Sequence, residues 1–315
     1  MDNVTHGLLG TAIGMVRRRS ADPSPENRAT DTAVIWAALA AAELPDADTF
    51  IGRGPMAEFT WHRAFTHSLA FTPVVAFVAA GIAKLVWRKA KFGTLYLWSL
   101  ASVLIAHLLN DYMTGWGTRL LLPFSQARLG LDWVPIVDLL YTVPLLVAVI
   151  IAWRRPSLRR KAVVAVLGYL LLYTFGYRGI SHALVERAVS ARYAGQNVAQ
   201  LQVSPDMLNP MAWSYTVDLG DRYERGQAYA TGSVESPTVI SKGPDDPVTR
   251  AVRSAPELQP FFAQFHYVTV FYRQTAEGYT ASMGDVRYGV GGHGMTYQVS
   301  LNQQLQVTQI KSGGW

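Results

Sequence analysis

The sequence predicts a mainly α polytopic membrane bundle of about four to six helices, followed by a small, mainly β extracytoplasmic domain. Three observations predict this fold class. Half of the 315 residues are hydrophobic and only 16% are charged, which is little charge for a wholly soluble protein. Six apolar stretches occur within the first 185 residues. Beyond about Arg187 they give way to short alternating runs, which are typical of strands.

The six apolar stretches fall into two length classes. Their approximate bounds are Val4 to Val16, Thr32 to Leu44, Ser68 to Trp87, Phe92 to Leu109, Trp133 to Trp153 and Ala162 to Ile180. The last four have 18 to 21 residues, enough to cross a hydrocarbon core of about 30 Å, and we expect each to span. The first two have only 13 residues each. We expect these two to span in part, to tilt, or to be buried as protein-facing helices.

The chain divides into a helical membrane domain at residues 1–185, a linker at 186–200 and a soluble β domain at 201–315. Runs such as WSYTVDL, FHYVTVFYR and MTYQVSLNQQLQVTQI predict the strands. A GVGGHGM segment lacks the strand-to-helix context of a phosphate loop, so a hairpin turn is the better interpretation. His266 and His293 lie in this domain, and we expect no catalytic role for either.

Composition excludes several classes of function. The net charge of +6 comes largely from basic loops, which can also contact membrane lipids. Because no run interleaves aromatic residues with Lys or Arg, we expect no nucleic-acid partner. The absence of Cys excludes disulfides, thiolate metal sites and cysteine nucleophiles. No basic segment precedes Val4, so we expect the first helix to be retained rather than cleaved as a signal.

The distribution of Lys and Arg predicts an orientation in the bacterial inner (cytoplasmic) membrane. Twelve cations lie in the loops after the first, third and fifth stretches, at Arg17, Arg18, Arg19, Arg28, Arg88, Lys89, Lys91, Arg154, Arg155, Arg159, Arg160 and Lys161. Only four lie in the opposite loops, at Arg53, Arg63, Arg119 and Arg128. Because basic loops stay on the cytoplasmic side, we expect the opposite loops and the C-terminal domain to be extracytoplasmic.

Seven His and Asp side chains occur at one end of the apolar stretches. They are His6 at the start of the first, Asp46 and Asp48 after the second, His62 and His67 before the third, and His107 and Asp111 at the end of the fourth. Successive spans alternate in direction, so all seven should meet at one membrane face. Because seven ligands exceed what one tetrahedral ion uses, the pattern predicts one or two divalent ions, Zn first, with Mn, Mg or Fe as alternatives.

Each motif also has a purely structural interpretation. The HRAFTHS box at 62–68 could be an interfacial His pair bonded to backbone, and the acidic ELPDAD turn could be solvated. The HLLND run places His107 and Asp111 on one helical face, where a contact between helices would also suit them. His6 alone would be a capping residue. The convergence of all four motifs on one side favours a metal site.

Four more residues on the same side are candidates for supporting roles. Asp138 and His182 could join the site or orient its ligands. Arg63 and Arg119 could bind an anionic substrate, or their side chains could simply snorkel to the membrane surface. Among the carboxylates, we expect Asp48 to be the general base.

The chain resembles the YdjM-like family of inner-membrane, metal-dependent hydrolases. The resemblance is carried, in order, by MDNVTHGLLG, ELPDAD, HRAFTHS, HLLND and TRLLLPFS leading to LDWVPIVD, and it continues through NPMAW and GDVRYG. The HRAFTHS box has Ala64 where the family usually has Gly, a small change that should not disturb a ligand. The resemblance implies metal-dependent hydrolysis at a membrane and names no substrate.

The leading hypothesis is therefore a membrane-embedded hydrolase whose metal site activates water, acting on a small-molecule or lipid-linked phosphoester. One alternative is a non-enzymatic metal-binding or transport protein, since His and Asp in membranes also form ion paths. A path should continue toward the cytoplasm, yet those helix halves consist of Leu, Val, Ala and Ile. Another alternative is an envelope scaffold in which the cluster only joins helices.

Overall fold

The computed structural model describes residues 1–17, 21–22, 24–289 and 295–313. They separate into two units. The helical unit comprises Met1–Phe50, Trp61–His182 and Ser204–Pro210, and the sheet unit comprises Ile51–Thr60, Ala183–Val203 and Met211–Trp315. Arg18, Arg19, His293 and most of the GVGGHGM segment lie outside the described residues.

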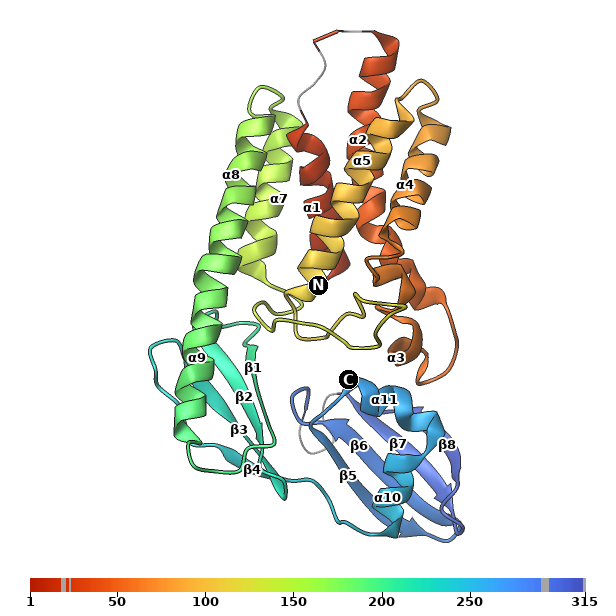
Figure 1. Cartoon of the computed structure of the whole chain (residues 1–315), viewed down its shortest axis with the longest axis vertical. Coiled ribbons are helices and arrows are strands. Elements are labelled where there is room, and N and C mark those ends of the chain that lie inside the picture. Colours follow the sequence, from red (N-terminus) through yellow and green to blue (C-terminus); the bar gives the residue numbers. More distant parts are fainter. Residues whose placement is uncertain (18–20, 23, 290–294, 314–315) are drawn as a thin grey trace. The chain divides into compact units, whose positions relative to one another are not determined.

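The first part of the chain is helical. Its elements are α1 (Asn3–Val16), α2 (Pro25–Glu43), the 3₁₀ helix η1 (Leu44–Phe50), α3 (Ala57–Trp61), the 3₁₀ helix η2 (Phe65–His67), α4 (Thr72–Val86), α5 (Phe92–Ser102), the π-helix η3 (Val103–Leu109), α6 (Asn110–Tyr112), α7 (Leu139–Arg154), α8 (Arg159–Leu171), the π-helix η4 (Leu172–Arg178) and α9 (Gly179–Arg192). In the helical unit, α1 packs against α2 and α7, α2 against α4 and α5, and α7 against α8 (Figure 1).

The two short N-terminal stretches are the inner helices of this unit. Small residues allow α1 and α2 to approach closely, as at helix interfaces in membranes. A Cβ at Gly10 would lie 2.6 Å from the Ala42 Cβ, and one at Gly14 would lie 2.7 Å from the Ile35 Cα. Ser102 of α5 donates a hydrogen bond to the Ala38 carbonyl of α2. Of the three arrangements expected for these stretches, the structure therefore has the buried, protein-facing one.

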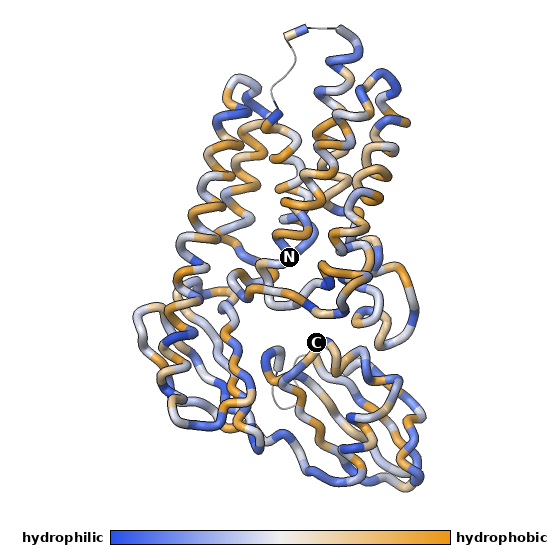
Figure 2. The backbone as a smooth tube through the Cα atoms, in the orientation of Figure 1, coloured by the Kyte–Doolittle hydropathy of each residue, from blue (hydrophilic) through white to orange (hydrophobic). Residues whose placement is uncertain are grey.

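The predicted number of spanning helices is only partly matched. Among the described residues, the helical segments Phe92–Tyr112 and Arg159–Arg192 are long and apolar enough to cross a membrane. Ala57–His67 and Thr72–Val86 qualify only together, across an 81° bend, and Leu139–Arg154 is shorter than a full span. The four full spans expected from stretch length thus reduce to two or three, because α4 begins only at Thr72 and α7 only at Leu139, later than the apolar stretches do. Apolar residues predominate along α4, α5, α7 and α8 (Figure 2).

The sheet unit contains two antiparallel meanders. The first has β1 (Gln200–Pro205), β2 (Ala212–Asp218), β3 (Arg222–Tyr229) and β4 (Thr238–Ser241) in sequential order. The second has β5 (Val268–Thr275), β6 (Gly278–Asp285), β7 (Thr296–Asn302) and β8 (Val307–Ser312). Between them lie α10 (Pro247–Ser254), the 3₁₀ helix η5 (Pro256–Leu258) and α11 (Gln259–Gln264). Along β5 and β7, buried residues alternate with less buried ones, which gives the second sheet one packed face.

The residues predicted as a linker, 186–200, are instead helical as far as Arg192. Val185, Val189 and Tyr193 are buried against Trp213 of β2, so this helix is the cover of the first sheet. These residues form a packed helix because apolar side chains line one of its faces and are buried against the sheet. A second contact was not expected from the sequence. Phe59 of α3 packs edge to face against Phe261 of α11 and against Phe265, which follows α11.

Candidate metal centre

The predicted ligands gather at one end of the helical unit. Asp46 and Asp48 lie on η1 after α2, His67 on η2 before α4, His107 on the π-helix after α5, and His6 in the first turn of α1. The basic α4–α5 and α7–α8 loops, the C-terminal end of α1 and the N-terminal end of α2 lie at the opposite end of the same unit (Figure 1). Alternating helix directions thus bring together residues as far apart in the sequence as His6 and Asp111.

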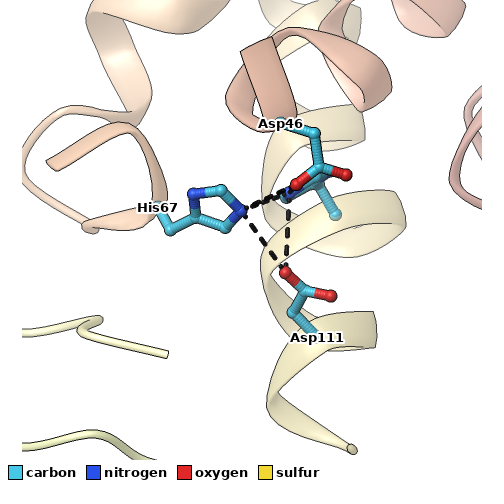
Figure 3. Close-up of side chains that lie close together, drawn as sticks. Asp46, His67 and Asp111 are labelled. Carbon is cyan, nitrogen blue, oxygen red and sulfur yellow. Dashed lines mark hydrogen bonds and ion pairs between the residues drawn. The ribbon is translucent and has the colours of Figure 1, made fainter. Parts of the chain in front are cut away.

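Four side chains form the centre of the cluster. Asp46, His67, His107 and Asp111 each offer a ligand atom within 4.8 Å of the others, and all four are buried. The Nε2 atoms of His67 and His107 are 2.9 Å apart. Asp46 Oδ1 lies 3.2 Å and 3.5 Å from these two nitrogens, and Asp111 Oδ2 lies 3.5 Å and 3.6 Å from them. In Figure 3 the side chains of Asp46, His67 and Asp111 point toward one another.

These separations fit the ligand shell of one metal ion. Ligand bonds of about 2.1 Å in a tetrahedron place neighbouring ligand atoms about 3.4 Å apart. The Asp111 Oδ2 atom is buried and has no hydrogen-bond partner among the described residues. A buried acceptor without a partner is costly, and an ion bound there would satisfy it. The donor set of two imidazoles and two carboxylates suits Zn²⁺ best and also accepts Mn²⁺ or Fe²⁺.

The histidine rings are held so that Nε2 faces the cluster. His107 Nδ1 lies 2.6 Å from the Ala42 carbonyl oxygen, and His6 Nδ1 lies 2.7 Å from that of Ala106. A carbonyl only accepts, so each Nδ1 carries the proton and each Nε2 keeps its lone pair. The Ala42 carbonyl is available because it lies in the last turn of α2. The π-helix that carries His107 is a form often found at functional sites.

Asp48 orients two histidines rather than facing the centre. Its Oδ1 lies 2.8 Å from His62 Nδ1, and its Oδ2 lies 3.1 Å from His67 Nδ1. Oδ2 also accepts hydrogen bonds from the Thr66 hydroxyl at 2.6 Å and the Arg63 backbone N–H at 3.1 Å. Asp48, His62 and His67 form a second group with potential ligand spacing. Since His67 belongs to both groups, His62 and Asp48 are best described as a dyad beside the centre.

The histidines determine the ionisation of both η1 carboxylates. Burial alone would raise the pKa of Asp46, but the neighbouring imidazoles of His67 and His107 lower it to about 2. Burial also opposes ionisation of Asp48, and hydrogen bonds from His62, His67 and Thr66 hold its pKa well below the usual range. Both carboxylates are therefore anionic at neutral pH, as metal ligands and His-orienting groups must be.

Asp111 connects the centre to His6 and Arg63. Its Oδ1 lies 3.2 Å from His6 Nε2 and 2.7 Å from Arg63 Nη2, and it also contacts the α-amino group of Met1. His6 stacks on His107 with ring centroids 4.2 Å apart. His6 belongs to neither ligand group of the described residues. With the Arg63 guanidinium on Oδ1, a second divalent ion on that side would be repelled, which favours one ion over two.

Arg63 is committed to structural contacts. Besides Asp111, its guanidinium donates to the Thr114 hydroxyl at 3.2 Å, and its side chain is buried. Its φ of 56° is a conformation that residues other than glycine seldom adopt and that concentrates at functional sites. Arg119 lies in the loop after α6, and its backbone N–H donates to the Arg63 carbonyl at 3.1 Å.

Asp138 and His182 are not brought into the cluster. Asp138 is the N-cap of α7 and accepts hydrogen bonds from the backbone N–H groups of Leu140 and Tyr141 and from the Tyr173 hydroxyl. His182 lies on α9, which contributes no residue to either ligand group in the part of the chain that is described. His266, in the sheet unit, is exposed.

Sequence reasoning missed two residues near the centre. Thr66 bonds to Asp48, and its position beside His67 in the HRAFTHS box was a usable signal, because a hydroxyl there can reach the same carboxylate. Arg128 was counted only as a loop cation. Its proximity to the site depends on a bridge between Thr118 and Leu129, for which the local sequence gives no signal.

Comparison with known proteins assigns the first part of the chain to a family. Residues 1–185 match the family described as YdjM inner membrane protein. The uncharacterized protein YfhP of Bacillus subtilis (strain 168) is 31% identical over 140 residues. That match covers 44% of this chain and 42% of YfhP, so the chain aligns with less than half of that relative's length. No solved structure matches.

Proposed function

The chain belongs to the YdjM inner membrane protein family, as its motifs predicted, and we propose that it is a metal-dependent hydrolase acting on phosphoesters at the membrane surface. The observation that carries this proposal is the buried group of Asp46, His67, His107 and Asp111, whose ligand atoms lie at the separations of a metal shell. Polar side chains that only join helices would need no such convergence of lone pairs, because hydrogen bonds among them would satisfy their polar atoms.

A divalent ion in this group would supply Lewis acidity and a water molecule of lowered pKa. Asp46, His67, His107 and Asp111 would hold the ion. Arg63 would fix the orientation of Asp111, and Asp48 would fix that of His67. Such orienting contacts on metal ligands are usual in hydrolytic sites and are costly to remove.

His62 is better placed than Asp48 to accept a proton. Both oxygens of Asp48 are engaged, and its lowered pKa makes it a weak base. His62 is the most exposed of the four clustered histidines, with 14% of its side chain accessible, and its Nδ1 is held by Asp48. A carboxylate that orients a histidine leaves the far ring nitrogen to exchange protons with substrate or water. We therefore assign the acid–base role to His62 and the orienting role to Asp48.

The substrate class follows from the cations near the cluster. Nη2 of Arg63 contacts Asp111 and its Nη1 donates to Thr114, so we assign anion binding to the second arginine expected for it, Arg119. A phosphoester presents the oxygens that a guanidinium binds in pairs. Because the cluster lies at the ends of apolar helices, a lipid-linked phosphoester can reach it from the bilayer.

The site and the sheet unit would lie on the extracytoplasmic side. Described basic residues of the α1–α2, α4–α5 and α7–α8 loops support this orientation through the positive-inside rule. Alkaline phosphatase fused after Trp315 should be active in cells, and green fluorescent protein fused there should not. Fluorescence without phosphatase activity would reverse the orientation and place the site in the cytoplasm.

The direct experiment combines metal analysis with turnover. The protein purified in detergent should contain about one Zn²⁺ per chain and hydrolyse generic phosphoesters or lipid phosphates, and chelation should abolish both. Stoichiometric metal without turnover on any ester would support the alternative of a metal-binding or transport protein. Absence of bound metal after reconstitution with Zn²⁺, Mn²⁺ and Fe²⁺ would remove the basis of both.

A further inference from the structure

The second sheet has one covered face and one open face. Helices α10 and α11 lie over the covered face, where Val270, Met283 and Tyr297 are buried and Tyr297 packs against α11 (Figure 1). Because side chains alternate along a strand, the residues between these point to the other face. Phe271 of β5 and Ser282 of β6 are such residues, and both are exposed.

The strand register arranges the open face in two rows that cross all four strands. One row consists of Phe271, Ser282, Gln298 and Lys311, and the other of Arg273, Thr280, Ser300 and Gln309. Neighbouring strands lie about 4.8 Å apart, so each row is about 14 Å long. Residues of both rows, together with Tyr272, form a hollow of about 330 Å³ over β5, β6 and β7. The open face is therefore a shallow binding surface with a defined set of side chains.

The two rows differ in composition from an ordinary solvated surface. Apart from Phe271, which is 46% exposed, every side chain of the rows is a hydroxyl, an amide or a cation. Arg273 and Lys311 are the cations, and neither has an ion-pair partner among the described residues. Solvated surfaces usually intersperse both signs of charge, whereas none of these eight side chains is a carboxylate. The face thus suits a ligand that is anionic and rich in hydrogen-bonding groups.

We propose that this open face binds an acidic polysaccharide, with Phe271 stacking on a sugar ring and Arg273 and Lys311 binding its carboxylates. A guanidinium binds a carboxylate through paired hydrogen bonds, and an ammonium binds it as a point charge. The hydroxyl and amide groups of Ser282 and Gln298 lie between the two cations and can donate to and accept from sugar hydroxyls. The negative face of an aromatic ring attracts the weakly positive C–H groups of a sugar.

Two other occupants fit the open face less well. Single-stranded nucleic acid stacks successive bases on several aromatic side chains, and the two rows contain only Phe271. A second copy of the same face would bring cations against cations, and interfaces between identical chains are more apolar than these rows are. A carboxylated sugar chain matches both the charge and the polar groups.

The test is binding of hexagalacturonate by the full chain in detergent, measured by isothermal titration calorimetry beside the neutral maltohexaose. The wild type should bind hexagalacturonate about tenfold or more tightly than maltohexaose, and Arg273→Gln should remove most of that preference, because a hydrogen bond between charged groups contributes about a factor of ten. Phe271→Leu keeps apolar area without an aromatic face, so it should weaken binding several-fold. The control Arg250→Gln, an exposed cation of α10, should bind as the wild type does.

Several outcomes would overturn the proposal. They are wild-type protein that does not bind hexagalacturonate, equal affinity for the two hexasaccharides, and unchanged affinity in Arg273→Gln and Phe271→Leu. Tighter binding of an oligothymidylate of similar length, lost in the same variants, would replace the polysaccharide by nucleic acid. Thermal unfolding of each variant identifies misfolding, and if Phe271→Leu does not fold, Arg273→Gln decides alone. None of these measurements uses metal or turnover, so the result is separate from the proposed hydrolase activity.

Discussion

Asp111 of the helical unit and Asp285 of the sheet unit are both buried, yet their surroundings differ. Asp285 is fully satisfied: Arg287 donates to both of its oxygens at 2.8 to 2.9 Å, and the Tyr267 backbone N–H adds a bond at 3.2 Å. Asp111 has cations on Oδ1, whereas Oδ2 faces two imidazole nitrogens at 3.5 and 3.6 Å. The first arrangement is complete as it stands, and the second leaves an acceptor for a ligand.

The contrast shows how to distinguish a structural polar site from a binding site. Burial disfavours the charged form of both carboxylates, and both have an arginine partner. They differ in the second oxygen, which has hydrogen-bond donors in Asp285 and none in Asp111 among the described residues. A carboxylate whose oxygens all have hydrogen-bond partners stabilises its own unit. A carboxylate with an oxygen that lacks a partner, beside other possible ligand atoms, can bind an ion. Substitutions in the two sites should therefore have different consequences.

The largest effect is expected from loss of a central ligand. His67→Ala or Asp111→Asn should abolish stoichiometric metal binding and lower hydrolysis by about 10³-fold or more, since a metal supplies several kcal/mol to the reaction. The checks are metal analysis and phosphoester turnover. The matched control is His266→Ala, an exposed histidine of the sheet unit, which should keep both. Full metal content in both ligand variants would show that the cluster is structural.

A different consequence is expected in the sheet unit. Arg287→Met leaves the Asp285 carboxylate buried without its partner, so the free energy of unfolding should fall by about 3–5 kcal/mol. Urea unfolding followed by tryptophan fluorescence measures this, because Trp213 is buried in the same unit. Metal content should stay unchanged. A variant that loses metal while keeping its stability would mean that the two sites do not differ as described.

An intermediate effect is expected for the orienting carboxylate. Asp48→Asn keeps the size of the side chain but weakens its bonds to His62 and His67, so metal affinity should fall about 10- to 100-fold. Competition with a chelator of known affinity measures the change. Asp245→Asn, on an exposed loop, is the control. Complete loss of metal in Asp48→Asn would instead make Asp48 a direct ligand.

The smallest effect is a graded dependence on pH. The lowered pKa of Asp46, about 2, means that its contribution is present above its ordinary value of 3.8 and is lost only as the pH falls through about 2. Protonation of the histidine ligands competes with metal binding at higher pH than protonation of Asp46 does. Metal should therefore be released well before the pH falls to about 2. Dialysis across a pH series tests this, and retention of metal down to pH 3 would contradict a histidine-based site.

Much of the fold and of the candidate site could be predicted from the sequence. Apolar periodicity located the helices, and alternation located most strands, because each pattern reflects the face that an element must bury. The same logic placed His6, Asp46, His67 and His107 at one end of the bundle. Helix limits were less predictable. Stretch length overestimated the spans, and the helix from Gly179 to Arg192 was taken partly for a linker, since polar residues on its exposed face mask the buried one.

By itself, the sequence determined that the protein has a helical, apolar first half, that its His and Asp motifs gather at one end of that half, and the family to which it belongs. Tertiary structure alone decided the roles within the cluster. Packing of α1 on α2 through Gly10 and Gly14, together with the π-helix at His107, sets distances of a few ångströms that no local pattern encodes. Contacts of Asp48 on η1 with His62 and His67 gave Asp48 its orienting role. Ligand geometry depends on contacts between distant segments, and those contacts exist only once the chain has folded.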